Sequence, residues 1–208
     1  MRAYTQYIGR YNLQNAMFPL EYMYITQGEN GGYSHQGTYA IDFAGYGSSG
    51  AIARCPYYAP CDMHLVAIAD LNNHGYAYTS SNRVNFIDGS VDYFTILVAH
   101  DNDLYYTGRR VSQGDILGHT GTYGNVTGDH VHMEIKKGQY EGLVRNSQGV
   151  YMLKNSTHIY DILGVNDTFM IRDLSYNWRV FQDTPIIETK KKKFPWVLYA
   201  NKFRNMKR

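Results

Sequence analysis

The sequence is poor in the features that stabilise small secreted proteins or anchor membrane proteins. It has only two cysteines in 208 residues, which excludes a disulfide-rich framework. It has no continuous apolar run of about 18 residues, so we expect no membrane-spanning helix. The first twenty residues lack the apolar segment of a signal peptide. We therefore expect synthesis in a cytoplasm and, for any action outside the cell, another route of release.

The two cysteines, Cys55 and Cys61, are separated by five residues. Two thiols cannot form a four-cysteine zinc site, and this spacing is not that of a zinc knuckle. A local disulfide and a pair of buried free thiols both remain open.

Charge is distributed unevenly along the chain. Residues 190–208 carry eight basic groups and no acidic ones, which leaves a net charge of −6 in residues 1–189. Such a tail suits contact with a polyanion, such as nucleic acid or an anionic cell-wall polymer. A solvated terminus is the simpler interpretation, and we do not expect nucleic acid as a partner.

The composition predicts a mainly β protein with little helix. Tyrosine and glycine are abundant, with 21 and 20 copies, which is typical of strands joined by tight turns. Residues 39–43 alternate in the strand period, and Asp88-Gly89 between the strand-like runs 83–87 and 91–100 predicts a hairpin. We expect a short helix only near residues 158–163.

These patterns divide the chain into three segments. We expect an N-terminal lead-in over residues 1–24, one domain over residues 25–165 and a C-terminal extension over residues 166–208 that ends in the basic tail. The lead-in is polar apart from Phe18-Pro19-Leu20, which we expect to anchor it.

The segment from Asp129 to Ile135 contains two histidines one residue apart. In a strand, successive side chains point to opposite faces. His130, His132 and Glu134 would therefore share one face, and the three apolar residues that alternate with them would share the other. The apolar face predicts core packing. The polar face predicts a metal ligand beside a group that handles protons or stabilises charge.

A second pair of polar residues lies upstream. Asp42 follows His35 by seven residues, which would place them on opposite faces of one uninterrupted strand. Gly37 between them permits a turn or bulge that brings both to one side. With His132 they form a set of two imidazoles and one carboxylate. This set suits one zinc ion and leaves the fourth tetrahedral position for water, as in a catalytic site.

Five motifs follow one another along the chain: His35-x-Gly with Asp42, Tyr58-Ala59-Pro60, the strand that ends at His100, residues 114–121 and residues 127–134. In this order they resemble the motifs of the LytM/lysostaphin-type M23 metallopeptidases. The resemblance spans roughly residues 25–165, and its last motif is the most specific. It implies an antiparallel β-sheet core with an open active-site groove.

The resemblance also implies roles for five residues. In this family, zinc is held by a histidine and an aspartate of the first motif and by the second histidine of His-x-His. His35, Asp42 and His132 are therefore the implied ligands. His100 and His130 are the implied catalytic residues.

The first motif departs from the common family spacing. Three residues usually separate its histidine and aspartate, whereas six do so here. Some bacteriophage tail-associated members resemble this chain in the longer insert. Asp62 and Asp70 are alternative carboxylates, but Phe43-Ala44 after Asp42 matches the usual family context and favours Asp42.

The implied chemistry is zinc-assisted hydrolysis of a peptide bond. His100 and His130 would take up the proton of the attacking water and stabilise the oxyanion, and which of them does which is left open. The chain has no His-Glu-x-x-His motif, so a glutamate base is not indicated. Glu134 is expected instead to orient a histidine.

By this resemblance, the substrate is bacterial peptidoglycan, cut in its stem or cross-bridge peptides. The missing export signal and a composition rich in lysine, asparagine and tyrosine favour a bacteriophage protein. It could lie in the virion tail, in contact with other tail proteins, or be an endolysin released at host lysis. The missing wall-binding module favours the tail. The alternative is a catalytically inactive M23-like binding or structural module. The presence of all five site residues argues against this alternative.

Overall fold

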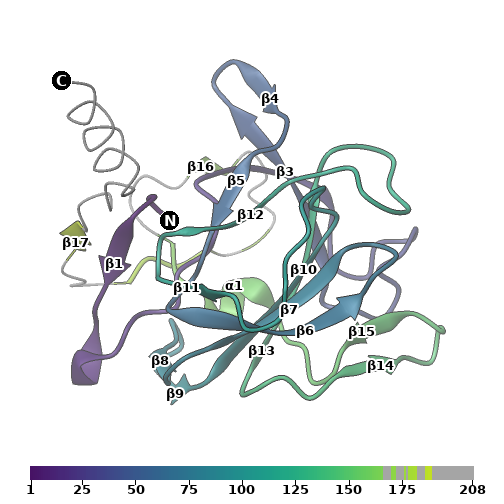
Figure 1. Ribbon diagram of the computed structural model, residues 1–208. Helices are drawn as coiled ribbons and strands as arrows, with labels where there is room; N and C mark the ends of the chain where they lie inside the picture. The colour runs from purple at the N-terminus through teal and green to yellow at the C-terminus, as the bar shows by residue number, and fades with distance from the viewer. Residues whose placement is uncertain (166–169, 172–175, 177, 182–185, 189–208) are drawn as a thin grey trace, which may run out of the picture.

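The computed structural model describes residues 1–208 apart from 166–169, 172–175, 177, 182–185 and 189–208 (Figure 1). The lysine run at 190–193 and the rest of the basic tail therefore lie outside the described residues, as does most of the expected extension.

The fold is built on one nine-stranded sheet (Figure 1). Its strands pair antiparallel, apart from the parallel pair β2 and β16. In spatial order they are β11 (Arg110–Val111), β6 (Met63–Asp70), β7 (Gly75–Ser80), β10 (Phe94–Ala99), β13 (Val131–Lys137), β3 (Ile41–Gly47), β2 (Tyr22–Gln27) and β16 (Met170–Ile171), with β4 (Gly50–Ile52) paired to β3. The prediction of a mainly β protein with an antiparallel core is confirmed.

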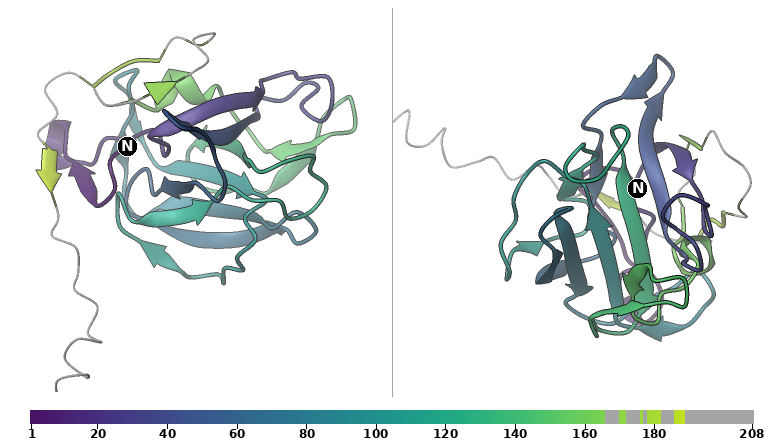
Figure 2. Two further views of the ribbon diagram at one scale, coloured as in Figure 1. Left: turned by 90° about the horizontal axis from the view of Figure 1, so that it is seen from above. Right: turned by 90° about the vertical axis from the view of Figure 1, so that its right-hand side faces the viewer.

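Shorter elements surround this sheet. They are the pairs β1 (Thr5–Tyr7) with β17 (Ile186–Glu188), β5 (Pro56–Tyr58) with β12 (Ile116–His119), β8 (Val84–Asn85) with β9 (Val91–Asp92) and β14 (Leu143–Arg145) with β15 (Tyr151–Leu153), the 3-10 helix η1 (Arg10–Asn12) and the helix α1 (Ile159–Ile162). The helix lies where the sequence predicts one. Within the described residues, no helix is long and apolar enough to cross a membrane. The hairpin of β3 and β4 stands out from the body of the sheet (Figures 1 and 2).

Side chains of the two central strands alternate between two environments. The residues that enter the main core are Phe94, Ile96 and Val98 of β10 and Val131, Met133 and Ile135 of β13. Leu97, on the opposite face of β10, packs with Leu153 beneath the β14–β15 hairpin. His132 and Glu134 point to this second face, as the strand period predicts.

The predicted Asp88-Gly89 hairpin is present but short. The Ser90 carbonyl accepts a hydrogen bond from Phe86 N, and Gly89 takes a φ of +90°. The run 91–100 is not one strand, however. It is divided into β9 and β10 at Tyr93, whose N–H donates to the Asp92 side chain (2.7 Å). The Asp92 side chain thus competes with strand pairing for this backbone N–H, and β9 ends there.

The main core extends beyond the expected domain at its N-terminal side. Ala16, Phe18 and Leu20 are fully buried in it, and the Phe18 ring lies 5.3 Å from the ring of Phe43. The expected boundaries at residues 24 and 165 stay predictions. Cys55 and Cys61 are both free and buried, and burial raises the pKa of the Cys55 thiol to about 11.

The central strand β13 gives a test of the packing. Ile135 is fully buried, whereas Ile68 on β6 is 38% exposed. We expect Ile135→Ala to lower the free energy of unfolding by about 2–5 kcal/mol because it leaves a cavity, and Ile68→Ala by roughly 1 kcal/mol or less. Denaturant titration of both variants checks this. Equal losses would contradict the assignment of this face of β13 to the core.

Candidate metal centre and groove

Strand pairing brings the predicted site residues to one end of the sheet. In the ladder between β13 and β3, His132 lies opposite Asp42. In the ladder between β13 and β10, His132 lies opposite Ala99, so His100 comes directly after the end of this ladder. His130 precedes β13 and forms an isolated bridge with Gly121.

His35 reaches this end from the loop before β3. Gly37 takes a φ of +69°, which a residue with a side chain adopts only with strain. The loop is further shaped by hydrogen bonds from His35 N to Gly31 O (3.1 Å) and from Thr38 N to His35 O (2.9 Å). The chain thus turns between His35 and Asp42, and both side chains face the same point.

Three donor atoms converge there. His35 Nε2 lies 3.2 Å from His132 Nδ1 and 3.2 Å from Asp42 Oδ1, and the last two atoms are 3.1 Å apart. In a tetrahedral zinc site with bonds of about 2.0–2.1 Å, two ligand atoms lie roughly 3.3 Å apart. The triangle therefore has the size that one zinc ion requires.

The second nitrogen of each imidazole in the triangle has its own acceptor. His35 Nδ1 donates to Gly28 O (3.1 Å), and His132 Nε2 donates to Glu134 Oε1 (3.3 Å). Glu134 is buried and is held in turn by Leu153 N (2.8 Å). These bonds place a proton on the outer nitrogen of each ring and turn its inner nitrogen toward the triangle, the orientation that a metal ligand requires.

The electrostatics of the triangle also favour a cation. Burial alone would raise the pKa of Asp42, but hydrogen bonds and charge from His132 and His35 hold it well below its usual range. Burial alone would lower the pKa of His132, but Asp42 and Glu134 raise it above its usual value. The two carboxylates thus stabilise positive charge at this point, and a metal ion can replace the proton.

Two further imidazoles lie beside the triangle. His100 Nδ1 donates to Tyr123 O (2.9 Å), and His130 Nδ1 donates to Gly128 O (2.9 Å). In each ring Nδ1 is therefore engaged by the backbone, and Nε2 is the atom left to face the site. The two ring centroids are 4.7 Å apart, and His130 Nε2 lies 3.7 Å from Asp42 Oδ2. Burial lowers the pKa of His100 to about 4, although the hydrogen bond with the Tyr123 backbone acts to raise it. This ring is therefore neutral at pH 7.

A groove passes through the site. One cavity of about 270 Å³ extends toward Asp70, Leu143 and Tyr151, and another of about 320 Å³ extends toward Thr26 and Tyr33. These two cavities are the arms of the groove, and both are lined by His100, His132, Ser34 and Asn125. A larger cavity of about 1110 Å³, beside η1 and residues 85–89, contains none of the site histidines.

The alternative carboxylates are engaged elsewhere. Asp62 Oδ1 accepts hydrogen bonds from Gln14 Nε2 (2.9 Å) and Gln113 N (2.8 Å). Asp70 accepts from Asn72 N (2.9 Å) and Asn73 Nδ2 (2.7 Å) in the turn after β6. Asp42 is the carboxylate that joins the two histidines of the triangle.

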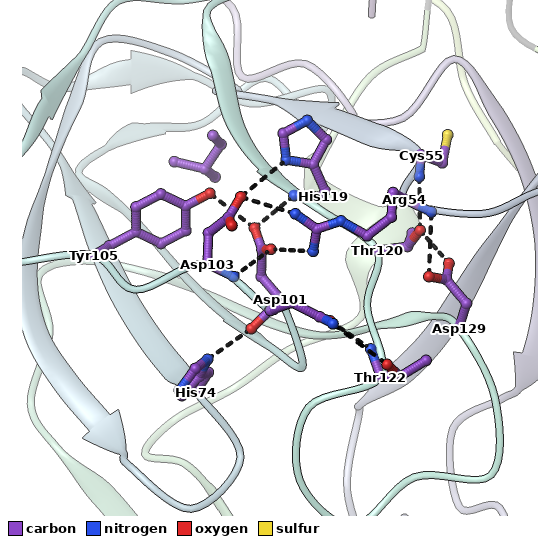
Figure 3. Close-up of polar contacts among 12 residues, drawn as sticks. Arg54, Cys55, His74, Asp101, Asp103, Tyr105, His119, Thr120, Thr122 and Asp129 are labelled. Atoms are coloured by element: carbon purple, nitrogen blue, oxygen red, sulfur yellow. Dashed lines mark hydrogen bonds and ion pairs between the residues drawn. The ribbon is translucent and has the colours of Figure 1, made fainter.

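A second cluster of possible ligand groups lies nearby. Within the described residues, Asp101, Asp103 and His119 also come within metal-binding distance of one another. The guanidinium of Arg54, however, contacts both carboxylates at 2.8 Å (Figure 3). We therefore assign this cluster no metal. No sequence motif predicts this cluster, apart from the position of Asp101 directly after His100.

Comparison with known proteins finds a phage relative. The chain is 38% identical over 173 residues to Morphogenesis protein 1 of Bacillus phage B103. The match covers 82% of this chain and 46% of the relative, so the chain spans about half the length of that protein. No family model matches the sequence.

Solved structures with a similar arrangement have low sequence identity. The catalytic domain of the prophage-encoded M23 protein EnpA from Enterococcus faecalis gives a TM-score of 0.42 at 18% identity, over 60% of this chain and 88% of that chain. The catalytic domain of lysostaphin from Staphylococcus simulans gives 0.37 at 20% identity, over 55% of this chain and 79% of that chain. At such low TM-scores we draw no functional conclusion from either likeness.

Metal binding distinguishes Asp42 from the other carboxylates. We expect the wild-type chain and Asp70→Ala to bind one zinc ion each, because the triangle is intact in both. Asp42→Ala should weaken binding by more than the roughly 10–100-fold that follows loss of an outer hydrogen-bond partner. Titration of the metal-free chain, with metal analysis after dialysis, measures this. Unchanged affinity in Asp42→Ala would contradict the assignment.

Proposed function

We propose that the chain is a zinc-dependent endopeptidase that hydrolyses peptide bonds in bacterial peptidoglycan. The observation that carries this proposal is the triangle of His35, Asp42 and His132 donor atoms, at the spacing of a tetrahedral zinc site, inside a groove. His100 and His130 lie beside it, and each ring is held at Nδ1 by a backbone carbonyl. This combination supplies metal ligands and proton acceptors at one point, as metal-assisted hydrolysis requires.

The donor set fits zinc and a catalytic role. Two imidazoles and one carboxylate are typical zinc ligands, and three of them leave one position open. When bound there, zinc would lower the pKa of a coordinated water to about 7 and polarise the scissile carbonyl. Glu134 acts behind this set as the acceptor that orients His132.

His100 and His130 handle the proton in this proposal. Each can accept a proton at Nε2, because its Nδ1 already donates to a backbone carbonyl. The ring that takes the proton from the attacking water becomes a donor at the same atom. It can then hydrogen-bond to the oxyanion or pass the proton to the leaving amine.

The proposed substrate class rests on the motif resemblance to M23 peptidases and on the shape of the site. The two arms of the groove meet at His100 and His132, which suits an extended peptide with the scissile bond at the junction. The phage relative supports a phage setting, and its name, Morphogenesis protein 1, favours a part in the virion over an endolysin. In that setting the chain would act in the tail, next to other tail proteins, during wall penetration.

The competing proposal is a catalytically inactive binding or structural module of the same type. A module that no longer needs metal would not need the hydrogen bonds that fix the rings of His35 and His132. Those bonds, together with the two neighbouring histidines, favour the enzyme. In this proposal, residues 25–165 form the peptidase domain, residues 1–24 are an N-terminal lead-in and residues 166–208 are a C-terminal extension.

Cell-wall hydrolysis by single-site variants tests the enzyme proposal. We expect the wild type to release peptides from purified peptidoglycan and His132→Ala to lose essentially all of this activity with its metal. His100→Ala and His130→Ala should keep the metal but lose about 10²–10⁴-fold in rate, the usual contribution of general acid–base catalysis. Mass spectrometry of the released peptides identifies the bond that is cut.

His64→Gln is the matched control, because His64 lies on β6 and lines neither arm of the groove. It should retain wild-type activity. A folded wild type that binds zinc but leaves peptidoglycan from several bacterial species intact would contradict the proposal. A metal-free wild type that binds the wall would favour the inactive module.

A further inference from the structure

Arg54 lies between the two segments that carry His100 and His130. It comes from the turn between β4 and β5, and neither its position in the sequence nor any motif connects it with the site. Figure 3 shows its side chain pointing toward Asp101 and Asp103, while its backbone lies near Asp129. Asp101 follows His100 directly, and Asp129 precedes His130 directly.

The side chain of Arg54 connects to the His100 segment. Arg54 Nη1 donates to Asp101 Oδ1 and Nη2 donates to Asp103 Oδ2, both at 2.8 Å. The Asp101 side chain is 1% exposed, so this is a contact with a buried carboxylate. Its other oxygen accepts from Tyr105 Oη (2.8 Å) and His119 N (2.7 Å). Both carboxylate oxygens of Asp101 are therefore held by hydrogen bonds.

The backbone of the same residue connects to the His130 segment. Arg54 N donates to Asp129 Oδ2 (3.2 Å), and Cys55 N donates to Thr120 Oγ1 (2.8 Å). The Thr120 hydroxyl in turn donates to the other oxygen of Asp129. Arg54 has a φ of +54°, a strained value for a residue with a side chain, which sends its N–H and its side chain toward different segments.

His100 needs such support because its own backbone is strained. Its φ is +79°, in a region that residues with side chains rarely adopt. Strained conformations persist only where the surroundings over-determine them. Here Asn73 O accepts from His100 N (2.9 Å), and Arg54 fixes the next residue. A shift of Asp101 would move the His100 ring away from Tyr123 O, its hydrogen-bond acceptor.

We propose that Arg54 is a positioning residue that sets the spacing and the tautomer of His100 relative to His130. The role in catalysis rests on the function proposed above. Arginine suits this position because its planar fork reaches two carboxylates at once, whereas a lysine ammonium is a single point of charge. Arg54 itself lines neither arm of the groove and makes no hydrogen bond to the triangle, so its side chain would act through the His100 segment.

Arg54→Met and Arg54→Lys test this role, with Arg110→Met on β11 as control, because Arg110 is exposed. We expect both Arg54 variants to bind one zinc ion with unchanged KM. Arg54→Met should lose about 10–100-fold in kcat, as small misplacements of a catalytic group do, and Arg54→Lys should recover part of this loss. In a His100→Ala background, Arg54→Met should cause no further loss of kcat.

A second readout does not need activity. The ¹⁵N chemical shifts of the His100 ring in the metal-free chain, assigned by comparison with His100→Ala, report which nitrogen carries the proton. The wild type and Arg110→Met should show Nδ1–H alone, and Arg54→Met should show a mixture of both tautomers. A wild type that hydrolyses nothing would refute the enzyme proposal, while this spectrum would still decide the role of Arg54.

Several results would overturn the proposal. The first is an Arg54→Met variant with wild-type kcat and wild-type His100 tautomer, whatever its melting temperature. The second is a loss of activity in proportion to a loss of zinc. The third is binding of two zinc ions by the wild type, because Asp101, Asp103 and His119 would then be ligands. Should Arg54→Met not fold, Arg54→Lys carries the same comparisons.

Discussion

The site depends on the convergence of three donor atoms, from His35, Asp42 and His132, which would repel one another or remain unsatisfied without a positive charge between them. Burying a carboxylate among imidazoles is costly unless every lone pair and every N–H has a partner. The chain meets this requirement through Gly28 O and Glu134, which hold the outer nitrogens of His35 and His132. The inner atoms then lie close enough together to hold one cation, as the proposed function requires.

The sheet supplies the rigidity on which this geometry relies. His132 and Asp42 are opposite residues of one ladder, so their separation is fixed by strand pairing. The catalytic candidates are placed differently. His100 and His130 lie just outside the ladders and are held by backbone carbonyls of the loop 121–128. Two of the three proposed ligands thus lie on paired strands, whereas His35 and the two proposed proton-handling histidines lie on loops that other residues must brace.

Much of this arrangement follows from short-range sequence patterns. The period of two in residues 130–135 predicts which face of β13 carries the histidines, and Gly37 predicts the turn that unites His35 with Asp42. The break at Tyr93 escapes prediction because an aspartate side chain competes with the strand for the backbone N–H. The contact of His100 with Tyr123 and that of Arg54 with Asp101 escape it because these partners lie far apart in the sequence and follow no local period.

Zinc K-edge X-ray absorption on the purified, zinc-loaded chain tests the three proposed ligands directly. We expect a four-coordinate shell of nitrogen and oxygen at about 2.0–2.2 Å with the outer scattering of two imidazoles, from His35 and His132. A shell of six oxygens, or sulfur at about 2.3 Å from Cys55 or Cys61, would contradict it.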